Sequence, residues 1–497
     1  MKNTGQSWNY SGVAPILEFL LITDPTETKS SGIAEKWEMA QDGLSWIFYL
    51  RKGVTWHDGS AVTAKDVKFS FERYKESGVR MTDIKNTMLS AEVVDDYTLR
   101  VYTLGADGKS NGPQAYFWRF ASPQPGQVGK IMPKDYFEKG GAANFERHPI
   151  GSGPYKFVRH GLADFIEYEA LPKHYRIVPT IKKITLLLLP EETTRIAMLK
   201  TGQVDIINIS PDSVPDVESA GLRTTVMSSI YPLVSFYMVY DPRAKGSPLT
   251  DVRVRQALSL AINREELKNT FFYGKLQPPM PPMIWTDQPE IDVPFWREYS
   301  AKAYRYDPVE AKRLLTEAGY ASGIPTFKLI STAGEGVPFN PRLAQVIQGY
   351  WSKIGAKAEI FPIEYASFQR MRQPYGAGKG MQVDIIGTAG MHQTDGGPIP
   401  IRSISSRFWS KATFDLYYGN DAARNEMDSY IDGAFNELDP KKRFELTAKA
   451  IKMATDSYLT LSIGGVPTLA ALGPRVDITY PPQSYGMVAA VESAKLK

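Results

Sequence analysis

Histidine often supplies metal ligands and proton-transfer groups, and this chain has only five histidines. No two of them stand at a metal-ligand spacing, and the HExxH pattern of helical zinc sites is absent. The chain has no cysteine, which excludes disulfides, a thiol nucleophile and thiolate metal sites. We therefore expect no metal, no cofactor and no catalysis, and interpret each histidine as solvated or hydrogen-bonded. The five are His57, His148, His160, His174 and His392.

Two glycine-rich stretches look like catalytic loops but lack the residues that such loops need. A Walker A loop has Ser or Thr after its lysine, whereas Lys379 is followed by Gly380. The run Gly151-Ser152-Gly153 is shorter than the G-x-S-x-G turn that exposes a nucleophilic serine. A hydrolase stays open as an alternative, because the carboxylates of glycosidases carry no local signature.

The bulk composition is that of a large globular protein. The 497 residues suggest about three domains. A hydrophobic share of 43% and a net charge of +4 argue against disorder, and there is no run of like charges that would suggest nucleic-acid binding. The longest apolar runs, such as Ile184–Leu189, are too short to span a bilayer, and the polar residues 1–10 contain no signal-peptide pattern.

Local patterns predict a β-rich first third, followed by alternating helices and strands. We expect a strand over 46–51, a helix that begins at Thr63 with Asp66 as its capping partner, and a hairpin over 92–101. Further strands are expected over 204–207 and 357–361. Asp307 and Asn263 are expected to cap helices, and another helix is expected over 343–354. The alternation favours α/β layers with parallel strands, with an α+β domain of mixed sheets as the alternative.

Pro/Gly-rich stretches at 278–282, 374–380 and 387–400 are interpreted as long loops or crossings. Aromatic residues make up 12% of the chain, a supply that suits either core packing or a cleft that encloses a ligand.

Five segments carry patterns that occur together in one protein family. They lie at 37–73, 149–155, 199–205, 251–264 and 307–320. The first is the most specific: it contains Asp42-Gly43, Leu50-Arg51-Lys52-Gly53, His57-Asp58-Gly59 and Thr63-Ala64-Lys65-Asp66-Val67. The second ends in Gly151-Ser152-Gly153-Pro154-Tyr155. In this order the segments resemble the family 5 extracytoplasmic solute-binding proteins of ABC importers, which include oligopeptide, dipeptide and nickel binders.

The resemblance implies an α/β, two-lobed periplasmic-binding-protein fold (type II, cluster C) with an additional third domain. Lobe I is expected from residues 1–36, 151–247 and 469–497, the extra domain from 37–150, and lobe II from 248–468. A ligand would bind between the lobes and drive hinge closure, and the closed protein would engage the membrane permease.

The resemblance also implies the solute-capturing component of an ABC importer, which binds a small molecule or peptide and works with ABC permease subunits. We expect a monomer that binds no nucleic acid, is not an enzyme, and is periplasmic or extracytoplasmic and membrane-associated. Family members carry a leader and a first strand before the stretch that resembles Gly12–Leu20. This chain begins almost at that stretch, which we interpret as a trimmed or misassigned start.

The resemblance places the ligand-binding residues of lobe II at 384–398. Family peptide binders have an aspartate there that pairs with the amino group of the peptide, and Asp395 stands at the corresponding position. An Asx turn is the alternative interpretation of Asp395. The neutral groups that precede it, and the candidate aromatic residues of the cleft, complete the expected site: Thr388, His392, Gln393, Thr394, Trp409, Trp8 and Tyr10.

The identity of the ligand has two interpretations. Pairing with Asp395 would suit a peptide, whereas neutral side chains and aromatic platforms would suit an oligosaccharide or an opine-like solute. In this segment of the family a tryptophan usually follows the glycine, whereas in this chain methionine follows it, as Gly390-Met391. That replacement argues against strict peptide specificity.

Overall fold

The computed structural model describes most of the chain. The described residues are 15–21, 32–75, 82–105, 108–115, 117, 130–162, 164–237, 239–240, 242–282, 284, 291–332, 339–364, 367, 386–394, 422–478, 492 and 494–497. Within these ranges the side chains of 82–83, 228–231, 242, 392–394 and 422–424 are not described.

The chain divides into two compact units, each described here by itself. The first comprises Met1–Ser228, Phe435–Pro440 and Thr468–Lys497, and the second comprises Ser229–Ala434 and Lys441–Pro467. The chain passes from one unit to the other within two strands, β9 (Arg223–Tyr237) and β14 (Val466–Leu472). The division into two lobes and an extra domain at the residues given above remains a prediction.

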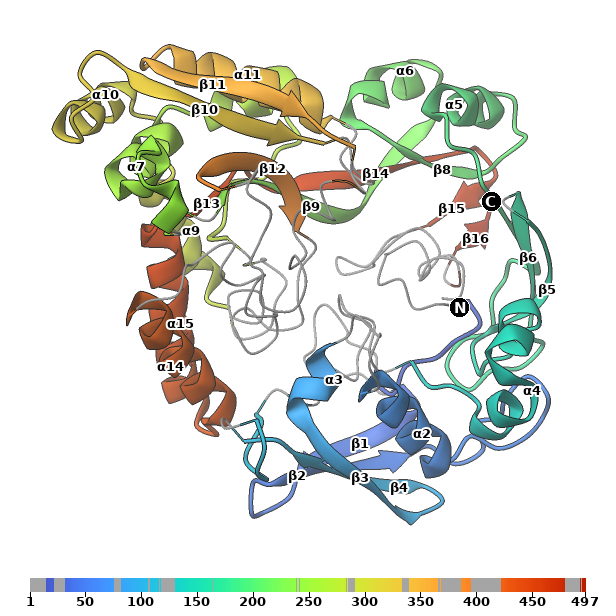
Figure 1. Ribbon diagram of the computed structural model, residues 1–497. Helices are drawn as coiled ribbons and strands as arrows, with labels where there is room; N and C mark the ends of the chain where they lie inside the picture. Colours follow the sequence, from blue (N-terminus) through green and yellow to red (C-terminus); the bar gives the residue numbers. More distant parts are fainter. Residues whose placement is uncertain are drawn as a thin grey trace. The chain divides into compact units, whose positions relative to one another are not determined.

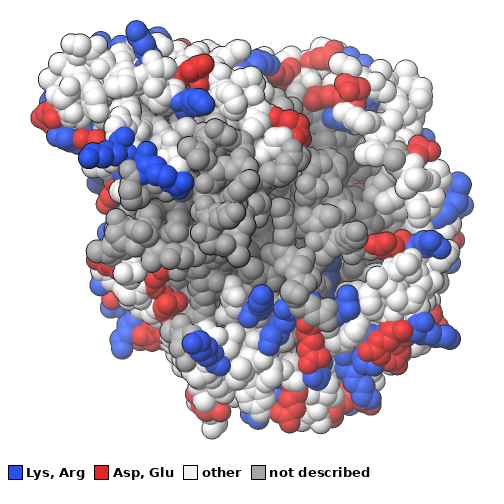
Figure 2. All heavy atoms as spheres, in the orientation of Figure 1, with Lys and Arg blue, Asp and Glu red and all other residues white. Residues whose placement is uncertain are grey.

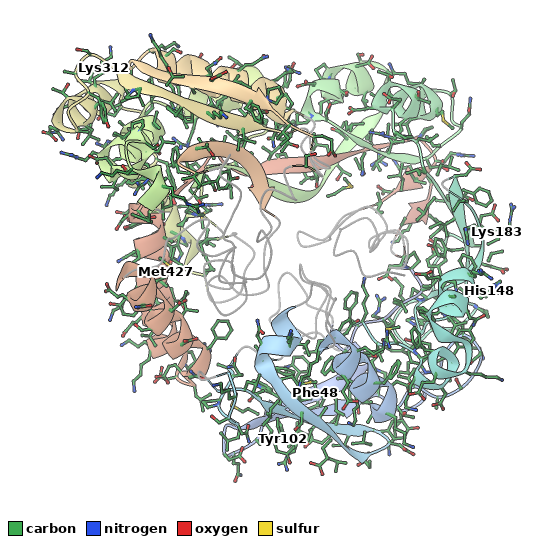
Figure 3. All side chains as sticks on the ribbon, viewed as in Figure 1. Phe48, Tyr102, His148, Lys183, Lys312 and Met427 are labelled. Carbon is green, nitrogen blue, oxygen red and sulfur yellow. The ribbon has the colours of Figure 1, made fainter. Side chains whose placement is uncertain are left out.

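A four-stranded antiparallel sheet opens the first unit. Its order is β1-β2-β4-β3, and its strands are β1 (Ala34–Met39), β2 (Ser45–Leu50), β4 (Thr98–Thr103) and β3 (Met88–Asp95). Helix α2 (Ala64–Lys75) covers one face (Figure 1). Phe48 is fully buried on that side, whereas Tyr102 lies on the outer side, where its hydroxyl donates to Glu92 (Figure 3). The expected strand, hairpin and helix are therefore confirmed.

The rest of the first unit holds a three-stranded antiparallel sheet and two strand pairs. The sheet is β5-β6-β7, with β5 (Tyr155–Gly161), β6 (Phe165–Ala170) and β7 (Lys183–Leu187). Tyr155 and Tyr168 are buried on its inner face with Ile16 and Leu17. The other elements are α3 (Thr82–Thr87), α4 (Lys134–Arg147), α5 (Glu192–Lys200), β8 (Ile206–Ile209), η2 (Pro211–Ser213), α6 (Val214–Ser219), β15 (Val476–Asp477) and β16 (Lys495–Leu496).

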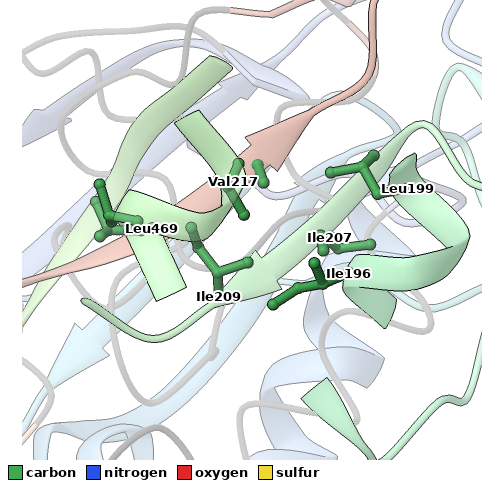
Figure 4. Close-up of a cluster of buried hydrophobic side chains, with 8 residues drawn as sticks. Ile196, Leu199, Ile207, Ile209, Val217 and Leu469 are labelled. Carbon is green, nitrogen blue, oxygen red and sulfur yellow. The ribbon is translucent and has the colours of Figure 1, made fainter. Parts of the chain in front are cut away.

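A buried aliphatic cluster joins α5, β8, α6 and β14 (Figure 4). Strand β8 pairs with β14 from Ile206 opposite Leu472 to Ile209 opposite Leu469. The strand expected over 204–207 thus begins two residues later. Gly202 has a φ of 73°, and the turn that it forms extends to Asp205, whose carbonyl accepts from the N–H of Gly473. Regular pairing begins only after that turn.

The second unit is built on a mixed sheet. Its strands are β11 (Ala356–Pro362), β10 (Ile324–Ser331), β12 (Thr388–Thr394) and β9, in that order, and β13 (Thr460–Ser462) also pairs with β9. Strand β10 is parallel to both β11 and β12. Strand β9 is antiparallel to both β12 and β13. Helix α11 (Asn340–Ser352) covers β10 and β11 (Figure 1). The α/β class with parallel strands is confirmed, and the sheet also has the antiparallel strand that the alternative anticipated.

The stretch 387–400 was expected to be a loop, but 388–394 forms strand β12. This stretch contains Gly390 and residues of modest β propensity, so its strand form reflects its place between β10 and β9 and not local preference.

Helix caps in the second unit match the expected ones. Asp307 accepts from the N–H of Glu310 at the start of α10 (Pro308–Glu317), and Asn263 accepts from the N–H of Glu266 in α8 (Arg264–Glu266). The remaining helices are η3 (Pro242–Ala244), η4 (Pro248–Thr250), α7 (Val252–Leu260), η5 (Leu267–Phe271), α9 (Val293–Ala303), α14 (Ala422–Asn436) and α15 (Pro440–Asp456).

None of the helices in the described ranges is long and apolar enough to cross a bilayer. Lysine and arginine side chains lie interspersed with aspartate and glutamate on the face drawn in Figure 2, as expected for the small net charge.

Candidate functional site

The parallel strands of the second unit end at one edge of its sheet, which we call the carboxyl edge. Leu329 of β10 is level with Ala389 of β12, and Ile330 is level with Gly390. Both strands run in the same direction, so their last residues reach the same edge. Ligands of α/β proteins characteristically bind in the crevice outside the carboxyl ends of the strands. The carboxyl edge is therefore the candidate binding region of this unit.

Three of the expected site residues, His392, Gln393 and Thr394, are the last residues of β12. They pair with Leu233, Pro232 and Tyr231 of β9, and this antiparallel pairing fixes their backbone at the carboxyl edge. The structure thus brings these three positions together. Their side chains lie outside the described residues, as do Asp395, Trp409, Trp8 and Tyr10.

Thr388 lies at the opposite end of β12. It is buried, level with Tyr237, and six residues before Thr394. At about 3.3 Å per residue, the strand separates the two threonines by roughly 20 Å. The structure does not bring Thr388 together with the other expected residues, because the expected loop is an extended strand.

Gly390 and Met391 occupy core positions in β12. A Cβ atom on Gly390 would lie 2.3 Å from a ring carbon of Tyr237, so only glycine fits beneath this buried ring. Met391, which stands where the family pattern has tryptophan, is fully buried. The methionine therefore serves the packing of this sheet.

Sequence reasoning missed three polar residues at the carboxyl edge. Ser331 is the last residue of β10, Thr332 follows it, and Asn340 is the first residue of α11. All three are buried. The signal in the sequence is a Ser-Thr pair at the end of an apolar strand, followed by a Gly-containing stretch and an Asn-Pro helix start.

His57 in the first unit is held by the backbone through both ring nitrogens. Its Nδ1 accepts from the N–H of Gly151 at 3.2 Å, so the ring proton sits on Nε2, which donates to the carbonyl of Gly153 at 3.0 Å. Its own N–H also donates to the carbonyl of Gly151. Burial lowers the pKa of His57 and keeps the ring neutral. The histidine thus fastens the His57-Asp58-Gly59 turn to the Gly151–Tyr155 segment.

His174 makes a similar arrangement with Ser152 of the same segment. Its Nε2 donates to the carbonyl of Ser152 at 2.9 Å, and its Nδ1 accepts from the N–H groups of Arg176 and Ile177. Burial lowers the pKa of His174 as well. The buried hydroxyl of Ser152 has no hydrogen-bond partner among the described residues. Neither histidine has a free nitrogen that could act as a general base in this arrangement.

A buried carboxylate, Glu18, lies beside His174. Arg176 donates to Glu18 at 2.7 Å and to Glu492 at 2.8 Å, and the hydroxyl of Tyr175 donates to Glu18 at 3.1 Å. Burial raises the pKa of Glu18, and the adjacent Arg176 opposes that rise. Burial alone would lower the pKa of Arg176, but the two carboxylates raise it well above its ordinary value. Through Arg176, this network links Glu18 to Glu492, which precedes β16, and stabilises the first unit.

Within the described ranges, no group of three or more His, Asp or Glu side chains is placed to hold a metal ion. His57, His174 and the Glu18–Arg176 pair of the first unit are thus engaged in structural contacts, and the carboxyl edge of the second unit is the candidate site.

The two neutral histidines predict an acid-sensitive fold. Because burial lowers their pKa values below the ordinary value of about 6.5, their contribution to stability is complete above that pH and is lost as the pH falls through the lowered values. The free energy of unfolding should fall below about pH 6.5 by up to about 1.4 kcal/mol per pH unit for each histidine. In the variant His57→Gln, the free energy of unfolding measured with urea should fall less steeply between pH 7 and pH 5 than in the wild type. Parallel curves for the variant and the wild type would contradict this assignment.

The sequence matches the family model described as "Bacterial extracellular solute-binding proteins, family 5 Middle" over residues 30–395. Heme-binding protein A of Haemophilus influenzae is 28% identical over 68% of this chain and 62% of its own length. The dipeptide-binding protein of Escherichia coli is 26% identical over 68% of this chain and 64% of its own length. The chain thus aligns with somewhat less than two thirds of each of these relatives.

The fold is similar to that of solved binding proteins. NikA from Brucella suis, determined in complex with Fe(III)-EDTA, superimposes with a TM-score of 0.80 at 21% identity, covering 98% of this chain and 95% of NikA. This likeness confirms the expected two-lobed α/β fold. The family match covers most of the chain and includes the segments from which the resemblance was inferred. The chain belongs to the family 5 bacterial extracellular solute-binding proteins.

Proposed function

We propose that this protein is the solute-capturing component of an ABC importer and that it binds a peptide or a peptide-like solute. The observation that carries the proposal is the family match over residues 30–395, which includes the candidate site through Asp395. The E. coli relative is a dipeptide-binding protein, which supports the peptide class. The protein would act outside the cytoplasm, deliver its solute to permease subunits as a monomer, and need no cofactor.

The proposed chemistry of binding combines one charge with neutral groups. Asp395 would accept from the ammonium group of a peptide, and His392, Gln393 and Thr394 would bind uncharged groups of the same ligand. The uncharged residues His392, Gln393 and Thr394 support a second candidate, an oligosaccharide or opine-like solute, because neutral hydrogen-bonding groups suit a hydroxylated ligand. The two candidates differ in their need for Asp395.

Isothermal titration with trialanine and maltotriose separates the two candidates. A charge-assisted hydrogen bond contributes roughly 1.5–3 kcal/mol, so Asp395→Ala should raise the Kd of trialanine by about ten- to a hundredfold and leave maltotriose unaffected. The matched control is Asp135→Ala, which removes a nearly fully exposed acid of α4 and should change neither Kd.

Binding of maltotriose without binding of trialanine would refute the peptide class. Recovery of shortened products from either probe would refute capture without turnover and support the hydrolase alternative.

A further inference from the structure

The pair Asn111-Gly112 is of the type most prone to spontaneous loss of an asparagine amide. It is the only Asn-Gly pair in the sequence. Glycine has no side chain that hinders the approach of its nitrogen to the preceding asparagine, so such a pair reacts readily wherever the backbone is free to turn. Asn111 is exposed, so solvent water reaches its side chain.

The reaction is a cyclisation followed by hydrolysis. The nitrogen of Gly112 attacks Cγ of Asn111, a nitrogen–carbon bond forms, and the side-chain amide leaves as ammonia with the proton of the attacking nitrogen. Water then opens the succinimide ring at either of its carbonyls. One opening gives aspartate. The other gives isoaspartate, in which the main chain runs through Cβ and Cγ and is longer by one carbon atom.

The folded chain holds the Gly112 nitrogen away from this reaction. Asn111 forms an antiparallel bridge with Leu104, directly after β4, and this pairing keeps its backbone extended. The ring closes only when the Gly112 nitrogen turns toward Cγ. The N–H of Gly112 instead donates to the carbonyl of Thr103 at 3.1 Å, and the hydroxyl of Thr103 donates to the carbonyl of Gly112 at 2.7 Å.

The backbone around Gly112 has no room for an additional atom. Gly112 is buried, and a Cβ atom on it would lie 2.4 Å from Cα of Gly105 and 3.0 Å from the Gly105 nitrogen. The N–H of Gly105 is itself bonded to the carbonyl of Ser110 at 2.9 Å. Both close contacts are with backbone atoms, so no rotamer change makes space. A main chain lengthened at Asn111 cannot take the same path.

We propose that Asn111 is a deamidation site that the fold of the first unit protects, and that modification there makes the opening of this turn irreversible. Deamidation proceeds only in chains in which Thr103 and Gly112 have separated, and isoaspartate then blocks their return. Local openings have free energies between zero and that of global unfolding, and a chemically altered open state cannot refold. The inference is independent of the identity of the solute.

The first experiment compares the full chain in buffer and in unfolding guanidinium chloride, both at pH 8 and 37 °C. Peptide mapping by mass spectrometry follows the conversion of Asn111, and chromatography separates aspartate from isoaspartate. The unfolded chain should convert at the rate of a free peptide with the sequence of residues 108–115. The folded chain should convert at least about tenfold more slowly, which requires an opening free energy of only about 1.4 kcal/mol.

The variant Thr103→Val tests the contacts that protect the site. Valine keeps the shape of this buried threonine and removes its hydrogen bond to the carbonyl of Gly112. In the folded variant Asn111 should convert about fivefold faster than in the wild type, because one such bond stabilises the closed turn. The matched control is Thr455→Val, which removes a buried hydroxyl bonded within α15 of the second unit and should leave the rate unchanged.

The products test the irreversibility. After conversion in denaturant and refolding, chains with isoaspartate at position 111 should melt at least about 2 °C below freshly refolded Asn111→Asp. That variant has the same new charge on a main chain of normal length. Asn111→Gln, given the same incubation as the wild type, controls for damage elsewhere in the chain and should melt with Asn111→Asp.

Each result decides one part of the proposal. Conversion of the folded chain at the rate of the peptide would overturn the protection, and an unfolded chain that retains Asn111 would overturn the modification site. Equal rates in Thr103→Val and the wild type would overturn the role of the Thr103–Gly112 bonds. Isoaspartate chains that melt together with Asn111→Asp would overturn the irreversibility.

Discussion

Replacement of Arg176 by methionine should lower the free energy of unfolding by about 3 kcal/mol at pH 8. The guanidinium bonds to Glu18, which is 2% exposed, and to Glu492. Methionine keeps much of the side-chain volume but leaves Glu18 as a buried, uncompensated charge. Removal of one partner from a buried ion pair characteristically costs about 3–5 kcal/mol, and the partial exposure of Arg176 favours the lower end.

The loss should depend on pH with a defined sign. Burial already raises the pKa of Glu18, and loss of Arg176 removes the main opposing cause. A carboxyl group with a raised pKa stabilises the fold below its unfolded pKa, and that contribution is lost as the pH rises through the folded value. The difference in free energy of unfolding between the variant and the wild type should therefore shrink as the pH is lowered from 8 to 5, measured by urea unfolding of both proteins.

Two further variants separate charge from packing. Adding Glu18→Gln to Arg176→Met removes the uncompensated charge and should recover most of the loss. Arg159→Met breaks a bidentate pair with Glu167 on the surface of β5 and β6, and should cost at most about 1 kcal/mol. Equal losses for the buried and the surface arginine would contradict the account of this network.

Replacement of Gly151 by alanine should be the most disruptive single-methyl change in the first unit. A Cβ atom there would lie 1.7 Å from the carbonyl oxygen of Ile16 and 2.6 Å from its carbonyl carbon. Both are backbone atoms, so no rotamer change can relieve the clash. Overpacking of a core costs about 1–3 kcal/mol where side chains can adjust, and we expect at least about 3 kcal/mol here. Chemical unfolding monitored by tryptophan fluorescence measures the loss.

The control for Gly151→Ala is Gly349→Ala. Gly349 lies inside α11, where an added Cβ meets nothing within 4 Å. Alanine in a helix interior is favoured over glycine, so this variant should be up to about 1 kcal/mol more stable than the wild type. A Gly151→Ala variant with wild-type stability would mean that the Gly151–Tyr155 segment does not pass as close to Ile16 as described.

Local signals predicted much of the fold. Asp66 and Asp307 are capping residues whose bonds form within three residues of sequence, so propensity and spacing suffice to identify them. The Gly151–Tyr155 motif was recognised by family resemblance, and the structure shows which contacts hold its backbone in place. The backbone of this segment is bonded by His57 and His174, and Ile16 lies against it.

The candidate site was harder to predict, because its geometry depends on long-range pairing. The stretch 388–394 has a weak β pattern, and its neighbours β10 and β9 make it a strand. That strand separates Thr388 from Thr394, which the sequence alone had grouped. Ser331 and Asn340 were not predicted, because the lack of a hydrogen-bond partner for a buried side chain is a property of the tertiary structure.

The central claim is that this protein captures a solute and releases it unchanged. Native mass spectrometry of the freshly purified protein, followed by denaturation, tests this most directly. The account predicts one small solute per chain, a peptide or peptide-like molecule, whose recovered mass stays constant after incubation of the complex at 37 °C for a day. Conversion of the solute into hydrolysis products by the wild-type protein during that incubation would contradict it.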